Sequence, residues 1–134
     1  MNKKQLLELL NTLKISKNEF WVLSSGALVL RDIYDKANDL DIAVTDEGLR
    51  ELKNNYNLKS KYNGWYIVEE LVECVCKGSI ENLEYKPQLL ECGYQVQNIK
   101  EYYNHLLSSS KEKNKLRIPI VEDYLNKNKK ERMI

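Results

Sequence analysis

Two aspartates separated by one residue are the pair in this sequence best suited to bind a metal ion. Asp39 and Asp41 lie in the segment 39–44, where polar and apolar residues alternate before an apolar end. This pattern predicts a strand that carries both carboxylates on one face, about 6–7 Å apart along the chain. Oxygen atoms at that spacing suit a hard cation such as Mg²⁺, which also binds water and phosphate oxygens. Taken alone, the same pattern is more typical of a solvent-facing strand edge.

A turn of small residues precedes this pair of acids. Ser24, Ser25 and Gly26 follow an apolar run, 20–23, that predicts a buried strand, and they come before residues 27–30, which begin a helix. Backbone N–H groups in a turn at the start of a helix can approach a phosphate group closely. The alternative is an ordinary helix cap, because serine is a favoured cap residue.

A third acid is set into a later apolar segment. Glu73 lies within residues 71–76, which predict a strand, and its rivals for the same role are Glu69 and Glu70. An acid on a neighbouring strand can complete a site for two metal ions about 3.5–4 Å apart. We favour Glu73 because apolar neighbours on both sides indicate a central strand. The alternative is a charge on an edge strand that discourages pairing with another chain.

Together these features resemble the DNA polymerase β-like nucleotidyltransferase superfamily, in particular its small stand-alone bacterial members. The family pattern is an apolar residue, Gly, then Gly or Ser, a spacer, Asp-x-Asp and later an acid between apolar residues. Residues 22–25, a spacer of thirteen residues, Asp39–Asp41 and Val72–Cys74 follow this order. The resemblance extends over residues 20–125, so it covers most of the chain.

The resemblance implies an α+β fold, a small mixed sheet with helices packed against it. It also implies the transfer of a nucleoside monophosphate from an NTP to an acceptor, with Mg²⁺ or Mn²⁺, two ions, as the cofactor. Catalytic and metal-binding roles would belong to Asp39, Asp41 and Glu73. The residues that would bind the nucleotide are Ser24, Ser25, Gly26, Arg31 and Lys113.

Two departures from the family pattern affect this interpretation. Ser24 stands where the family usually has its first glycine, although an alternative register through Ser25 and Gly26 restores a glycine with a spacer of twelve. Small relatives also often carry Arg-x-Lys-Asp-x-x-Asp-Ile near the C-terminus. Here Lys113 matches the lysine, while Asn114 and Arg117 replace the two acids.

The resemblance leaves the acceptor open among RNA, protein and small molecules. Some relatives belong to toxin–antitoxin or phage-defence pairs, and larger relatives carry an extra helical domain for the acceptor. A homodimer or a partner protein would then supply that surface for this chain. The alternative function is a catalytically inactive domain of the same fold that binds nucleotide or a protein partner. A purely structural domain with a chance motif is a further alternative.

The rest of the pattern predicts the elements that would position these residues in a single domain, 1–134, with a frayed tail at 127–134. The expected helices are 3–14, one from 27, one after Thr45 or Asp46, one from 99 to 107, and a last one that begins at Pro119. The expected strands are 20–23, 39–44, 65–68 and 71–76, with weaker candidates at 83–85 and 94–96.

Composition and charge exclude several classes of protein. The chain has 134 residues, 43% hydrophobic and 31% charged, which is enough apolar material for a core. Its 21 basic and 20 acidic residues leave a net charge of +1, unlike that of a strongly basic nucleic-acid-binding protein. The charges are unevenly placed, because residues 1–110 carry a net −3 and residues 111–134 a net +4. Seven acids fall between positions 32 and 51.

The cysteines and the lack of apolar runs indicate a cytoplasmic protein without a membrane partner. Three cysteines, an odd number, argue against a disulfide framework. Cys74, Cys76, Cys92 and the single histidine, His105, could form a zinc site only if the fold brought all four together. No run approaches the roughly 18 apolar residues that a membrane-spanning helix needs.

Overall fold

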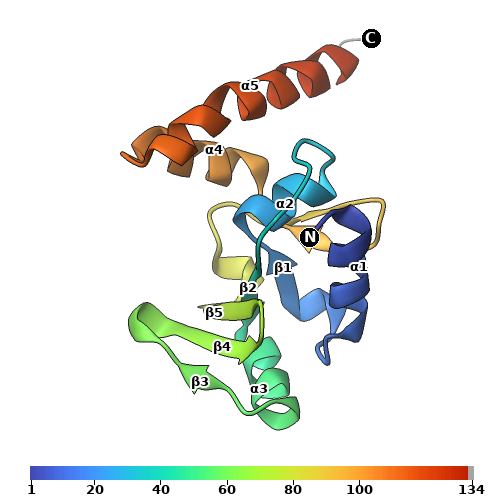
Figure 1. Cartoon of the computed structure of the whole chain (residues 1–134), viewed down its shortest axis with the longest axis vertical. Coiled ribbons are helices and arrows are strands. Elements are labelled where there is room, and N and C mark those ends of the chain that lie inside the picture. The colour runs from blue at the N-terminus through green and yellow to red at the C-terminus, as the bar shows by residue number, and fades with distance from the viewer. Residues whose placement is uncertain (133–134) are drawn as a thin grey trace. The chain divides into compact units, whose positions relative to one another are not determined.

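The computed structural model describes residues 1–132 and has an α+β fold, as predicted (Figure 1). The chain divides into two compact units, Met1–Gln97 and the part from Asn98 onward, which are described separately. The first unit contains a mixed seven-stranded sheet with the order β3-β4-β5-β2-β1-β7-β6. Within residues 1–132, no helix is long and apolar enough to cross a bilayer.

The strong strand predictions are confirmed, and the weaker ones are confirmed only in part. The strands are β1 (Phe20–Val22), β2 (Leu40–Thr45), β3 (Lys59–Ser60), β4 (Trp65–Glu69), β5 (Val72–Gly78), β6 (Gln88–Leu89) and β7 (Gln95–Val96). Residues 83–85 form no strand, because the short 3₁₀ helix η3 (Ile80–Asn82) ends in an irregular segment there. Two further 3₁₀ helices are η1 (Lys17–Glu19) and η2 (Tyr62–Gly64).

The centre of the sheet combines antiparallel and parallel pairing. Strand β2 runs antiparallel to β1 and parallel to β5. In the second pair Asp41 lies opposite Glu73, and Ile42 lies opposite Cys74. Strand β4 forms an antiparallel hairpin with β5, while β7 lies parallel to β1 on the other side. The sequence segments that carry the predicted acids are therefore adjacent strands.

One face of the sheet is covered by helices. These are α1 (Lys3–Thr12), α2 (Ser24–Leu30) and α3 (Asp46–Asn55). Side chains of all three helices share one apolar cluster with alternate residues of β2; the cluster includes Leu6, Leu10, Ala27, Val29, Leu52, Leu40, Ile42 and Val44. Because successive side chains of a strand alternate between faces, Asp41 and Ala43 lie on the opposite face.

That opposite face has a smaller apolar cluster. It contains Trp21 of β1, Ala43 of β2 and Val75 of β5, with Leu23 and Trp65 packed against them. Asp41 belongs to the same alternation as Ala43, and Glu73 to the same alternation as Val75. The two acids therefore lie beside this small cluster, on the face away from α1–α3.

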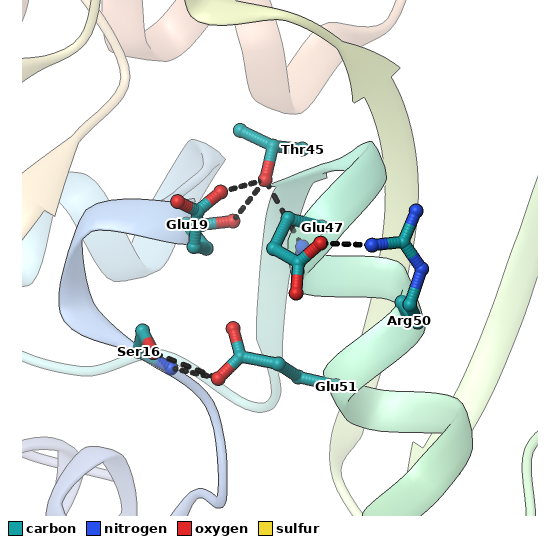
Figure 2. A network of polar contacts seen from close by, with 7 residues as sticks. Ser16, Glu19, Thr45, Glu47, Arg50 and Glu51 are labelled. Atoms are coloured by element: carbon teal, nitrogen blue, oxygen red, sulfur yellow. Dashed lines mark hydrogen bonds and ion pairs between the residues drawn. The ribbon is translucent and has the colours of Figure 1, made fainter.

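A polar network fixes the junction between β2 and α3 (Figure 2). Thr45 is almost fully buried, caps α3 by accepting a hydrogen bond from the Gly48 N–H at 3.0 Å, and donates its hydroxyl proton to the Glu19 carboxylate. Figure 2 also shows Ser16 bound to Glu51, through a hydroxyl that donates at 2.7 Å. Of the two predicted cap candidates, Thr45 and Asp46, Thr45 is the cap, and it fixes where β2 ends.

The second unit consists of α4 (Ile99–Ser108) and α5 (Glu112–Arg132). Arg117 donates to the Tyr102 hydroxyl at 2.9 Å, and the Tyr103 hydroxyl donates to Glu122 at 3.0 Å. The predicted start of the last helix at Pro119 is wrong, because Pro119 lies inside α5. The residues before it, rich in Glu, Lys, Leu and Arg, favour helix strongly enough to begin one seven residues earlier. Helix α5 continues to Arg132, and residues 133–134 of the expected tail lie outside the described residues.

Candidate functional site

The predicted turn of small residues is the first turn of α2, which begins at Ser24 rather than at residue 27, and it lies beside the start of β2. The N–H of Leu23 donates to the carbonyl of Asp41 at 2.9 Å, so the turn and the Asp-x-Asp segment are held together through the backbone. Ser24 and Ser25, which follow Leu23, are half-exposed and form the first residues of α2. The family resemblance implied that these residues and the acids belong to one site.

Ser24 adopts a left-handed backbone conformation, with φ at 51°. This is the region that glycine enters without cost and that other residues enter with strain. Its N–H donates to the Gln97 side-chain oxygen at 3.1 Å. Ser24 therefore holds a backbone conformation that is typical of glycine, although it carries a Cβ atom.

At Gly26, steric crowding rather than backbone conformation requires glycine. A Cβ atom there would lie 2.8 Å from Cγ1 of Val22, which is fully buried in the core. Gly26 itself is buried. Its lack of a side chain allows α2 to pack closely against β1, and this packing role distinguishes it from Ser24 and Ser25.

Asp41 and Glu73 are the two predicted acids that the sheet register brings directly opposite one another. Burial raises the pKa of Asp41 to about 6, and repulsion from the Asp39 and Glu73 carboxylates adds to the rise. Asp39 is exposed and lies just before β2. These three charges therefore influence one another in the folded chain, which is the electrostatic condition in which a bound cation is favourable.

Of the three acids considered for the last position, the sheet places Glu73 opposite Asp41. Glu69 is the final residue of β4 and is paired with Val72, and Glu70 is exposed in the turn that follows. The apolar context that favoured Glu73 reflects its place on β5, between β2 and β4.

Lys61 is a residue of this candidate site that the sequence did not indicate. Its ammonium group contacts both carboxylate oxygens of Glu73, at 3.0 Å and 3.2 Å. It also lowers the pKa of Asp41, against the effect of the two neighbouring acids. Its hydrogen bond to Glu73 is the main cause of a raised pKa for the Lys61 ammonium. Lys61 lies in a polar stretch without periodicity, so no pattern indicated that it faces the acids.

A pocket of about 250 Å³ joins these groups. Its lining consists of Asp41, Lys61, Tyr62, Asn63, Trp65 and Glu73. One wall is therefore anionic, one residue is cationic, and two aromatic rings complete the lining. A phosphorylated ligand with a planar ring would find partners of the right chemistry in such a pocket.

Of the two basic residues predicted to bind nucleotide, Arg31 is held by hydrogen bonds and Lys113 is exposed on α5. Arg31 ends α2, at the opposite end from Ser24, and its guanidinium donates to the Gln88 side chain and, at 3.0 Å, to the Gln97 carbonyl. Arg31 thus holds the residue whose side chain accepts the Ser24 N–H. Lys113 lies in α5 of the second unit and is exposed. Its role as a nucleotide ligand stays a prediction.

The carboxylate oxygens of Asp41 and Glu73 meet part of the requirement for a site that binds a hard cation. Among residues 1–132, no group of three or more His, Cys, Asp or Glu residues is already arranged around a common point. The two opposed carboxylates of Asp41 and Glu73 offer the oxygen ligands that Mg²⁺ and Mn²⁺ prefer, and Lys61 now provides the positive charge beside them. The cysteines are free thiols, and burial raises the pKa of the Cys74 thiol to about 11.

A second hollow, of about 320 Å³, lies at the start of α3. Its lining includes Glu19, Thr45, Asp46 and Glu81 and contains no residue predicted to act in the site. It is larger than the pocket at Asp41 but lacks a cationic side chain in its lining.

Comparisons of the chain with protein-family models, with curated proteins and with solved structures gave no match.

Proposed function

We propose that this chain is a metal-dependent nucleotidyltransferase, which transfers a nucleoside monophosphate from an NTP to an acceptor and releases pyrophosphate. The observation that carries the proposal is the direct opposition of Asp41 and Glu73 on adjacent strands, next to the turn that begins at Ser24. Opposed acids on a sheet repel one another and cost stability, so a bound cation gives them a function.

The carboxylates have distinct roles in this proposal. Asp41 and Glu73 would hold a divalent cation, and Asp39, exposed at the entrance to β2, would hold the second or complete the first. When bound, Mg²⁺ or Mn²⁺ supplies charge neutralisation of the triphosphate and activation of the attacking oxygen. The half-buried position of Asp41 strengthens its interaction with a cation, because less water screens the charge.

Ser24 and Ser25 would bind the triphosphate through their hydroxyl groups. The Ser24 N–H already donates to Gln97, and Arg31 fixes the Gln97 carbonyl, so the turn has a set shape before any ligand binds. A turn that is held in advance loses little conformational freedom on binding. The acceptor is RNA, protein or a small molecule, and a second copy of the chain or a partner protein would supply its surface.

Two hydrogen bonds favour the alternative, a domain that binds nucleotide or a protein partner without turnover. The Ser24 N–H, which the family pattern would direct at phosphate, is bonded to Gln97, and the Glu73 carboxylate is bonded to Lys61. Both bonds would have to open or rearrange for catalysis. Such a chain would bind nucleotide but transfer nothing.

A label-transfer assay tests the proposal. Each of the four NTPs, labelled at the α-phosphate, is incubated with the chain, Mg²⁺ or Mn²⁺, and cellular RNA and protein. We expect label on an acceptor, and we expect Asp41→Asn or Glu73→Gln to reduce it by at least about 100-fold. Asp35→Asn is the control, because Asp35 is an exposed acid of the loop before β2 and lies outside the pocket.

Label transfer that survives in Asp41→Asn would reject the proposed catalytic role of this acid. Nucleotide binding that depends on Mg²⁺ without any transfer would establish the non-catalytic alternative. Absence of both binding and transfer would reject the function altogether.

A further inference from the structure

The pocket contains an ion pair between Lys61 and Glu73. Both oxygens of Glu73 are used, at 3.0 Å and 3.2 Å from the ammonium nitrogen. Lys61 immediately precedes η2, and its N–H donates to the Trp65 carbonyl at 2.7 Å, which ties the lysine backbone to β4. The lysine therefore reaches the acid from a fixed point on the neighbouring hairpin.

The charges around this pair are unbalanced. Glu73 and Asp39 both act on Asp41 as like charges, and Lys61 is the cation that opposes them. The Lys61 ammonium thus acts on the charges of both Glu73 and Asp41. A divalent cation would carry more charge to the same oxygens, so it would compete with Lys61 for Glu73.

We propose that Lys61 is an exchangeable counter-ion: it occupies Glu73 in the metal-free chain, leaves it when a divalent cation binds, and then binds the phosphates of the nucleotide. This inference rests on the proposed function, since it concerns the same site. It adds a nucleotide-binding residue and a competitor for the metal ion at Glu73, neither of which the sequence indicated.

Exposure makes the exchange feasible. About a third of each side chain is accessible, 36% for Lys61 and 32% for Glu73, so water screens their attraction and a partly exposed pair is weak. Once released, the ammonium stays at the border of the 250 Å³ pocket, where Asn63, Tyr62 and Trp65 complete the lining. A lysine ammonium is a compact point charge that pairs well with phosphate.

The test compares two ligands that should respond in opposite directions to the same substitution. The first is Mn²⁺ alone, titrated into the metal-free chain by calorimetry. We expect Lys61→Met to tighten Mn²⁺ binding by about fivefold, because a partly exposed ion pair no longer competes. The matched control is Lys59→Met, two residues earlier on β3, where the side chain is exposed and lies outside the pocket.

The second ligand is the set of α,β-methylene analogues of the four NTPs, added at saturating Mn²⁺. For the analogue that the wild-type chain binds best, we expect Lys61→Met to weaken binding by about tenfold, because a phosphate contact is lost. Lys61→Gln, which keeps a polar side chain, should show the same signs. It provides the comparison if the methionine variant loses its far-ultraviolet circular dichroism.

The outcomes separate this inference from the proposed function. If the wild-type chain binds Mn²⁺ and Asp41→Asn does not, but Lys61→Met leaves the Mn²⁺ affinity unchanged or weaker, the exchange is wrong and the proposed function stands. Unchanged analogue binding in Lys61→Met would likewise overturn the exchange. If the wild-type chain binds neither Mn²⁺ nor any analogue, the proposed function fails together with the inference.

Discussion

Asp41 is the residue at which the loss of stability caused by the site can be measured most directly. Its pKa is raised to about 6 in the folded chain, first by burial and then by the neighbouring acids, whereas an unfolded aspartate titrates at roughly 3.9. The folded chain therefore binds this proton more tightly than the unfolded chain does. The free energy of unfolding consequently falls as the pH rises from about 4 to about 6.

Asp41→Asn should remove this loss of stability. Without metal, we expect the variant to match the wild-type chain at pH 4 and to exceed it by about 1 kcal/mol at pH 7, a value that allows for solvent screening of a half-exposed group. Urea denaturation at both pH values, in buffer with chelator, measures the difference. A difference that is equal at the two pH values would show that ionisation of Asp41 is not the cause.

Ser24 is a second residue whose conformation lowers the free energy of unfolding, because it holds φ at 51° with a Cβ atom present. Ser24→Gly should raise the free energy of unfolding by about 0.5 kcal/mol, since relief of the left-handed strain exceeds the greater freedom of glycine in the unfolded chain. Ser25→Gly, one position later in α2, should lower it by about 0.5–1 kcal/mol. Urea denaturation of both variants checks the opposite signs, and a loss of stability in Ser24→Gly would contradict the account.

At the scale of elements, the junction of η1, β2 and α3 fixes the far end of the acid strand. Gly48 lies in the first turn of α3, where a Cβ atom would come within 2.5 Å of the Glu19 carbonyl oxygen. The obstacle is backbone, so it cannot rotate away. Gly48→Ala should therefore lower the free energy of unfolding by about 2 kcal/mol.

The neighbouring Glu47 provides the control for this substitution. Glu47 is exposed and pairs with Arg50 on the same helix, as Figure 2 shows, so Glu47→Ala should change stability by no more than about 0.5 kcal/mol. Thermal unfolding of both variants measures the contrast. Equal effects of the two substitutions would contradict the crowding at Gly48.

The elements that could be predicted are those whose periodicity is long enough to read. The alternation before Val44 predicted β2, the leucine spacing predicted α1, and the cap candidates Thr45 and Asp46 predicted the start of α3. Strands β3 and β6 have only two residues each, too few for any period, and their places depend on pairing with neighbours. Pro119 is typical of a helix start, but the helix-forming residues before it allow α5 to begin at Glu112.

The site was predictable to the extent that it depends on neighbouring strands. The Asp-x-Asp segment and the acid at position 73 were identified from residue type, spacing and the family resemblance, and their opposition follows from the parallel pairing of β2 with β5. Lys61 could not be predicted, because its contact with Glu73 depends on the turn at η2 and on the register of the β4–β5 hairpin. The left-handed conformation of Ser24 could not be predicted from the sequence either.

At the scale of the whole molecule, every residue of the pocket lies within the first compact unit, Met1–Gln97. Gln97, which accepts the Ser24 N–H, is the last residue of that unit. We therefore expect a fragment of residues 1–97 to fold and to bind Mn²⁺ with a dissociation constant within about twofold of that of the whole chain. Circular dichroism and calorimetry test this expectation, and a folded fragment without Mn²⁺ binding would contradict it.

The uneven charge of the chain is best understood through the same site. The acidic surplus between positions 32 and 51 includes Asp39 and Asp41, and the Lys61 ammonium opposes the effect of the neighbouring acids on Asp41. A divalent cation would reverse the local sign and make this face attractive to a triphosphate. The near-neutral total thus conceals a locally anionic site suited to a cation.

The central claim is that Asp41 and Glu73 act together to hold a divalent cation. A double-mutant cycle on Mn²⁺ affinity tests it most directly, with the wild-type chain, Asp41→Asn, Glu73→Gln and the double variant measured by calorimetry under one condition. The account predicts that each single substitution weakens Mn²⁺ binding at least about tenfold and that the double variant is little weaker than either. Binding that is unchanged in both single variants would contradict the claim.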